Sequence, residues 1–369
     1  MKNHHHLLQA VDRQKEKQMK KGGGPYLHWW QLSLIGIGSI IGAGFFLGTG
    51  LSIKIAGPSI LFGYLIAGIT IFFVFSALAE MTVNDPEPGS FRTYARKAYG
   101  RSAGFVSGWM YWLSGILIMS SEIVALSTFT QFWFPHTPLW IFSIIYAALG
   151  FAINFLGVKN FGQIESLFAV VKISILVCFI GFGALFILGV VHPKEFSIHQ
   201  SGMGSFFPNG VKGLWSAMIF IFFSFGGIEV VGVASSELDN KKDITKAGTG
   251  LIITLVSIYI LSLFFVLNMV NWTKIDESES PFVTALSAFQ IPYLDSLFNL
   301  IIISAAFSTM VGALFSISRV MVSLAEDGDA PKILKEKKQP WRSTESPINN
   351  SRRFKHLDSF FLFAAKYNV

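Results

Sequence analysis

Long apolar runs are the feature that most limits what this chain can fold into. A membrane-crossing helix needs about 20 mostly apolar residues, and eight runs reach that length: roughly 29–52, 58–81, 104–133, 138–156, 163–190, 213–235, 248–271 and 293–323. The runs are continuously apolar rather than alternating, which argues against membrane-spanning strands. Only 14% of the residues are charged, too few to cover a soluble protein of this size. We therefore expect an all-α membrane protein.

The basic residues lie between the runs, so the net charge of +7 does not indicate a nucleic-acid-binding surface. With the N-terminus inside, the inner segments hold Arg13, Lys15, Lys17, Lys20, Lys21, Arg92, Arg96, Lys97, Arg101, Lys159, Lys241, Lys242, Lys246 and a basic tail from Lys332. The outer loops hold only Lys54, Lys194, Lys212 and Lys274. The positive-inside rule then predicts a multi-pass plasma-membrane protein with both termini, 1–28 and 324–369, in the cytoplasm.

The loop 82–102 is predicted to contain a short amphipathic helix that lies on the inner membrane surface, with an ordinary basic loop as the alternative. Ser90 would cap it. Its apolar face would hold Phe91, Tyr94, Ala95 and Ala98, and its basic face Arg92, Arg96 and Lys97.

The first run is unusually rich in glycine, with six glycines between Gly36 and Gly50. Close helix packing is one explanation, because small residues let membrane helices approach each other. The other is an unwound segment around Gly42-Ala43-Gly44, whose bare N–H groups would face an anion and whose carbonyls would face a cation. An amino acid zwitterion carries both charges.

A second glycine pair, Gly226-Gly227, lies in the sixth run, and a carboxylate, Glu229, follows it. The two runs are five apart, and a repeat of five helices must return with inverted topology. Paired interrupted helices in inverted halves point to the binding site of a transporter. The second glycine pair therefore favours an unwound segment, rather than close helix packing, around Gly42-Ala43-Gly44.

Three other ionisable residues fall inside apolar runs: Glu122, Glu165 and Lys172. Each costs about 2.5 to 3.5 kcal/mol at a helix centre, so each needs a partner or a role. Glu122 and Glu229 are either substrate-site residues or structural hydrogen-bond partners. We expect Glu165 to be an interfacial carboxylate. Lys172 is a candidate to gain and lose a proton, or to act as a fixed cation.

The residues give no sign of enzyme chemistry. We expect no catalytic residues, no metal site and no cofactor, since no nucleophile–base pair, Cys-His zinc spacing or phosphate loop occurs. His4, His5 and His6 are expected to be solvated, and no obligate protein partner is indicated.

Four segments resemble bacterial amino-acid permeases of the amino acid–polyamine–organocation (APC) superfamily. They are Ile41 to Gly48 with Ala56-Gly57-Pro58, Ser76 to Met81 with Pro86 to Gly100, Ser224 to Glu237, and Arg319 to Pro331. The resemblance runs from about residue 26 to 331. It implies a LeuT-like fold of twelve spans built as a five-plus-five inverted repeat, and import of an amino acid by proton symport.

The resemblance also implies site roles. The substrate carboxylate would bind at Ile41, Gly42, Ala43 and Gly44, and its amino group at the break that includes Phe225, Gly226, Gly227 and Glu229. Phe225 would gate the site, Glu122 and Glu229 would line it, and Lys172 would couple transport to the proton.

About eight of the twelve spans are recognisable here. Residues 29–190 form the first repeat and residues 213–323 an incomplete second one, which leads us to expect a C-terminal truncation. A membrane sensor that binds amino acids, or an inactive permease fragment, are the alternatives to a transporter.

Overall fold

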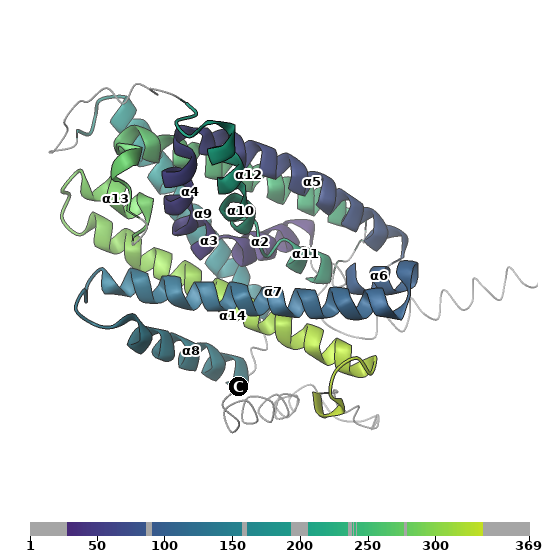
Figure 1. Ribbon diagram of the computed structural model, residues 1–369. Coiled ribbons are helices and arrows are strands. Elements are labelled where there is room, and N and C mark those ends of the chain that lie inside the picture. Colours follow the sequence, from purple (N-terminus) through teal and green to yellow (C-terminus); the bar gives the residue numbers. More distant parts are fainter. Residues whose placement is uncertain are drawn as a thin grey trace, which may run out of the picture.

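The computed structural model describes residues 28–85, 91–156, 161–192, 206–234, 238, 240, 242–276 and 279–334. Helices make up the architecture of this part of the chain (Figure 1). The α-helices are α2 (Trp29–Ile40), α3 (Ala43–Phe46), α4 (Gly48–Ala56), α5 (Ile60–Asn84), α6 (Phe91–Tyr99), α7 (Arg101–Gln131), α8 (Leu139–Leu156), α9 (Phe161–Ile187), α10 (Gly210–Phe223), α11 (Glu229–Ala234), α12 (Asp243–Met269), α13 (Pro281–Ser287) and α14 (Leu294–Glu326). Short 3₁₀ turns lie at Gly57–Ser59, Trp272–Lys274 and Lys332–Leu334.

Each of the eight apolar runs coincides with one or more of these helices. Five helical stretches are long and apolar enough to cross a membrane by length and composition: Ala43–Asn84, Arg101–Gln131, Glu165–Ile187, Asp243–Met269 and Leu294–Glu326. Leu139–Asn154 and Gly210–Phe223 are shorter apolar helices. The first and sixth runs are not single long helices because their chains are interrupted. The expected all-α membrane fold is thus confirmed.

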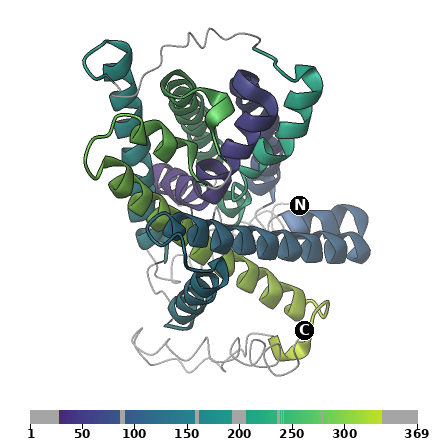
Figure 2. The same ribbon diagram turned by 60° about the vertical axis from the view of Figure 1, so that its left-hand side comes forward.

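The longest helices, α7 and α14, cross each other along one side of the bundle, and α5 runs beside α12 on another (Figures 1 and 2). α2 lies between them and packs against α9 and α12. Glycines permit these close approaches, as in other membrane helix pairs. Gly115 of α7 faces Ile317 of α14, and a Cβ there would collide with the isoleucine. The start of the first interrupted run, α2, is therefore packed among continuous helices, whereas α10 of the sixth run keeps an exposed face that includes Trp215 and Ile219.

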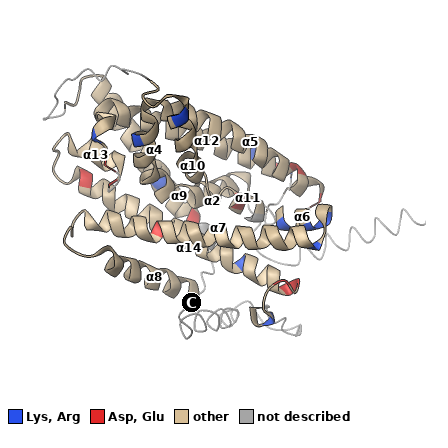
Figure 3. Ribbon diagram, in the orientation of Figure 1, with Lys and Arg blue, Asp and Glu red and all other residues tan. Residues whose placement is uncertain are grey.

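The amphipathic helix forms as α6, but its surroundings differ from the prediction. Residues 86–90, including the expected cap, lie outside the described residues. Arg92, assigned to the solvated basic face, is buried and forms an ion pair with Asp327 at the end of α14. Arg96 reaches the same carboxylate at 2.6 Å. Asp327 thus pairs with two of the three basic residues of α6, and α6 packs along α7 (Figure 3 shows the basic residues on α6).

Several predicted features fall outside the described residues. These are the N-terminal tail up to residue 27 with its three histidines, Lys159, Lys194, Lys241, and the C-terminal tail from residue 335. The predicted eighth span, 293–323, is continued by α14 as far as Glu326.

Candidate functional site

The first run is unwound at Ile41 and Gly42, which we call the first break. α2 ends at Ile40, both residues have extended backbone, and the chain becomes helical again at Ala43. The interruption therefore begins one residue before the predicted glycine cluster. A Cβ on Gly42 would lie 2.5 Å from Glu122 Oε1 and 2.9 Å from Thr309 Oγ1. Glycine is needed here because side chains from two other helices close in on the backbone.

Glu122 of α7 is bound to the first break. The backbone N–H of Ala43 donates to the carboxylate, with both oxygens 3.0 Å from the nitrogen. The side chain is buried, with 2% of its surface exposed. An unwound segment at this depth must have its backbone groups satisfied by protein or water. Glu122 thus accepts the hydrogen bond of Ala43 N–H, one of the groups that we predicted would bind the substrate carboxylate.

Lys172 reaches the first break from the other side. It is fully buried on α9, and its Nζ donates to the Gly38 carbonyl and, at 2.9 Å, to Thr309 Oγ1. The Thr309 hydroxyl lies 3.1 Å from the carbonyl of Ile41, to which it can donate. One ammonium group therefore contacts α2 directly and the break itself through a threonine of α14.

Glu165 corrects one expectation, since it is not an interfacial carboxylate. Only 2% of its surface is exposed, and it lies on α9 against Gly38 of α2. Helix packing buries it, because the bare Gly38 backbone lets α9 come close. The carboxylate interacts electrostatically with Lys172.

The sixth run is interrupted between α10 and α11, at residues 224–228, which we call the second break. Gly227 has a φ of +105°, and a Cβ there would lie 2.5 Å from the Ser39 carbonyl oxygen. Both the backbone conformation and the contact with α2 require glycine. Glu229 Oε2 accepts the N–H of Gly227 at 3.0 Å, so this carboxylate is also bound to a break.

The second break is hydrogen-bonded to α3, the short helix that follows the first break. Ser224 Oγ donates to the Gly44 carbonyl at 2.7 Å, and the Tyr64 hydroxyl lies 2.8 Å from the same Oγ. Tyr259 OH donates to the Ser224 carbonyl at 3.1 Å. In the described part of the chain, the carbonyls of Phe225 and Gly226 accept no hydrogen bond and remain as acceptors.

An aromatic cluster covers the site. It consists of Phe45, Tyr64, Phe225, Tyr259 and Phe282, all essentially buried. Phe45 and Tyr259 are stacked, with ring centroids 3.8 Å apart and planes at 10°. Phe225 lies 5.9 Å from Tyr64 and 5.4 Å from Tyr259, and Phe282 of α13 lies 5.2 Å from Phe45. The predicted gate, Phe225, is therefore one member of a packed aromatic layer.

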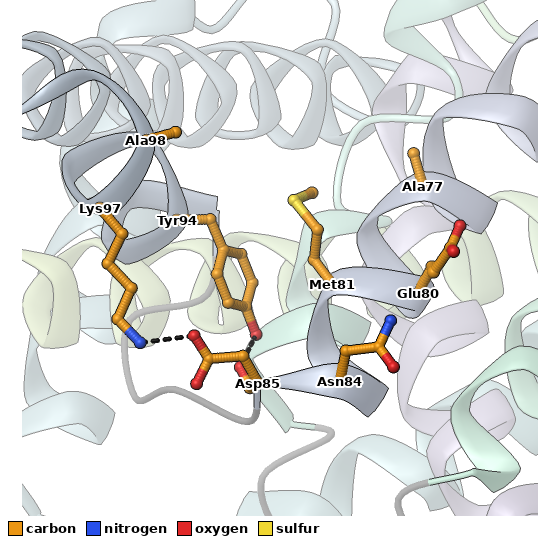
Figure 4. A pocket seen from close by; sticks show the side chains of 8 residues that line it. All are labelled: Ala77, Glu80, Met81, Asn84, Asp85, Tyr94, Lys97 and Ala98. Atoms are coloured by element: carbon orange, nitrogen blue, oxygen red, sulfur yellow. Dashed lines mark hydrogen bonds and ion pairs between the residues drawn. The ribbon is translucent and has the colours of Figure 1, made fainter.

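Two surface hollows lie away from the breaks. One, of about 610 Å³, separates the end of α5 from α6 (Figure 4). It holds an ion pair between Lys97 and Asp85 at 2.5 Å, and Tyr94 OH donates to the Asp85 carbonyl at 2.9 Å. The other, of about 210 Å³, is lined in part by Gln131, Glu279 and Asn299. Neither is lined by a predicted site residue.

The structure thus gathers the predicted residues around two adjacent breaks, and it adds others that sequence reasoning missed. The additions are Thr309, Ser224, Tyr64, Tyr259 and Phe45. A weak signal existed for the tyrosines and for Thr309, since each is a polar group inside a long apolar run. Nothing in the sequence shows which of many such groups point inward.

Comparison with known proteins gives a family. The family described as "Amino acid permease" matches residues 31–344. The chain is 44% identical to the uncharacterized transporter YcgH of Bacillus subtilis, over 88% of this chain and 73% of that protein. It is 36% identical to the aromatic amino acid transport protein AroP of Escherichia coli K12, over 87% and 70% of the two chains. It is also 36% identical to AroP of Salmonella typhi, over 88% of this chain and 71% of that protein. The matched residues include both breaks, and the chain therefore belongs to the amino acid permease family of multi-pass membrane transporters.

Proposed function

We propose that this protein imports a neutral amino acid across the plasma membrane together with a proton. One observation carries the coupling: Lys172 Nζ donates to Gly38 and to Thr309, whose hydroxyl lies 3.1 Å from the Ile41 carbonyl. A change in the charge of Lys172 would therefore act on α2 at Gly38 and, through Thr309, on the backbone of the first break. The protein does no covalent chemistry and needs no cofactor other than the coupling ion.

The two breaks supply both halves of a zwitterion site. The N–H groups around Ala43 would receive the carboxylate, and the carbonyls of Phe225 and Gly226 would receive the ammonium group. Among the described residues, both carboxylates at the breaks already bind backbone N–H groups, and the Lys172 ammonium group is bound by Gly38 and Thr309. We therefore favour a neutral substrate. Because the AroP relatives are named for aromatic amino acids, phenylalanine is the first compound to test.

The proposed orientation places the start of α2 in the cytoplasm. Trp29 is partly exposed there, and Lys246 of α12 lies over its ring at 5.0 Å. A tryptophan beside a lysine is typical of a membrane–water interface on the positively charged side.

The test uses purified protein in lipid vesicles with labelled phenylalanine. An inside-alkaline pH gradient is expected to drive accumulation, whereas an equal Na⁺ gradient is not. Lys172→Ala should abolish gradient-driven accumulation. Accumulation that is indifferent to the pH gradient, or unchanged by Lys172→Ala, would refute proton coupling. Binding without any exchange of substrate would instead identify a sensor.

A further inference from the structure

Within the proton-symport function proposed above, we propose that Glu165 is a second proton carrier. It would accept the proton of Lys172 across Gly38 and release it toward the cytoplasmic end of α9. Nothing in the two glycine breaks requires this residue, so the assignment rests on its own surroundings.

The first argument is the state of the Glu165 carboxylate. It is 2% exposed, and its Oε1 has no hydrogen-bond partner among the described residues. A buried carboxylate oxygen with no donor is unfavourable and calls for a functional explanation. A protonated carboxyl group would remove the charge, and therefore the greater part of the cost of burial.

The second argument is the position of Gly38. Its carbonyl accepts the hydrogen bond from Lys172 Nζ, and a Cβ built on it would lie 2.8 Å from Glu165 Oε1. The ammonium group and the carboxylate therefore both lie against Gly38, which has no side chain to stand between them. Glu165 and Lys172 are seven residues apart on α9, so they share a helix face.

The third argument is the donor count of Lys172. A lysine ammonium has three N–H donors, and two are used by Gly38 and Thr309. Loss of the third proton breaks one N–H bond and leaves a neutral amine that still makes both hydrogen bonds. The proton forms an O–H bond on Glu165, which becomes a neutral acid and then returns the proton to water. Both hydrogen bonds of Lys172 therefore persist when its side chain becomes neutral.

The charges around Glu165 favour this transfer. Lys172 is the charged group that acts on it, and α2 contributes no charged side chain. On the other helices that pack against α9, Lys246 lies over Trp29, and Arg319 lies over Phe315 at 4.6 Å. Glu122 of α7 also interacts with Lys172. Of these two carboxylates, Glu165 is the one on the same helix as Lys172, and it lies near the start of α9.

The experiment separates proton release from substrate movement. Vesicles containing the protein are assayed with labelled phenylalanine for pH-gradient-driven accumulation and for counterflow exchange at equal pH. Exchange does not require the proton to leave the carrier. We expect Glu165→Gln to lower accumulation about tenfold or more and to leave counterflow within about twofold of the wild-type rate. Glu165→Asp should recover part of the accumulation, and the exposed carboxylate variant Glu80→Gln should change neither.

Two results would overturn the proposal. One is accumulation in Glu165→Gln that matches the wild type. The other is a parallel loss of accumulation and counterflow, which would make Glu165 a structural residue. Infrared spectra give a test that does not depend on transport: the wild-type-minus-Glu165→Gln difference spectrum should contain a carboxylic-acid band that grows as the pH falls, and the lack of such a difference band would count against the assignment. A wild-type protein that ignores the pH gradient would instead defeat the proposed symport itself.

Discussion

The carboxylate of Glu122 holds the N–H of Ala43, with both oxygens 3.0 Å from the nitrogen, although 79 residues separate the two in the chain. A substrate carboxylate arriving at the first break would meet this charge. If the first break binds the substrate carboxylate as proposed, Glu122 would compete with it for the Ala43 N–H.

Glu122→Gln should strengthen substrate binding. The amide oxygen can still accept from Ala43, while the repulsion between two carboxylates disappears. We expect the Kd for phenylalanine at neutral pH to fall about tenfold, equivalent to about 1.4 kcal/mol. Equilibrium binding to detergent-purified protein measures this. Weaker binding in the variant would show that the charge is needed for the site to form.

Thr309→Val should weaken the link between Lys172 and the first break. The hydroxyl accepts from Lys172 and lies within reach of the Ile41 carbonyl, and valine keeps the shape but leaves a buried donor unpaired. The cost is about 1 to 3 kcal/mol. The midpoint of thermal unfolding and the gradient-driven uptake should both fall. Thr128→Val is the control, because that hydroxyl is exposed and bonds only within its own helix; equal effects of the two changes would contradict the prediction.

Two adjacent glycines should respond very differently to alanine. At Gly227 a Cβ would lie 2.5 Å from the Ser39 carbonyl oxygen, and φ is +105°. At Gly226 the nearest atom would be 3.1 Å away, with an ordinary φ. Gly227→Ala must therefore push α2 from the second break, a loss of about 3 kcal/mol or more. Folded yield by fluorescence-detected size exclusion should drop for Gly227→Ala and be largely kept for Gly226→Ala. The reverse order would mean that the contact with Ser39 is not needed.

Asp327→Asn should loosen α6 from the end of α14. Arg92 is buried with its Nε and Nη1 unsatisfied, so Asp327 is its main compensation. Arg92 is buried while the Asp327 side chain is 32% exposed, so leaving the guanidinium without this acceptor should cost about 1 to 3 kcal/mol. Asp85→Asn breaks the exposed pair with Lys97 and should cost about 0 to 1 kcal/mol. Hydrogen exchange of α6 should rise in the first variant and stay unchanged in the second.

The sequence predicted the architecture well, because membrane helices are set by local composition. Residue type and position predict the apolar runs, the two interrupted runs and the burial of Lys172. Glu165 could not be placed, because a single sequence does not show which helix face is packed. That face is decided by Gly38, which lies 127 positions earlier in the chain. Thr309 was missed for the same reason, since its partner Lys172 is 137 residues away.

Gly38 contacts both titratable residues of the proposed proton path. Its carbonyl engages Lys172, and its missing side chain admits Glu165. A rotation of α2 about its axis would withdraw the acceptor from the lysine and close the gap beside the carboxylate in the same movement. The departure of the proton and the movement of the first span would then be linked through Gly38.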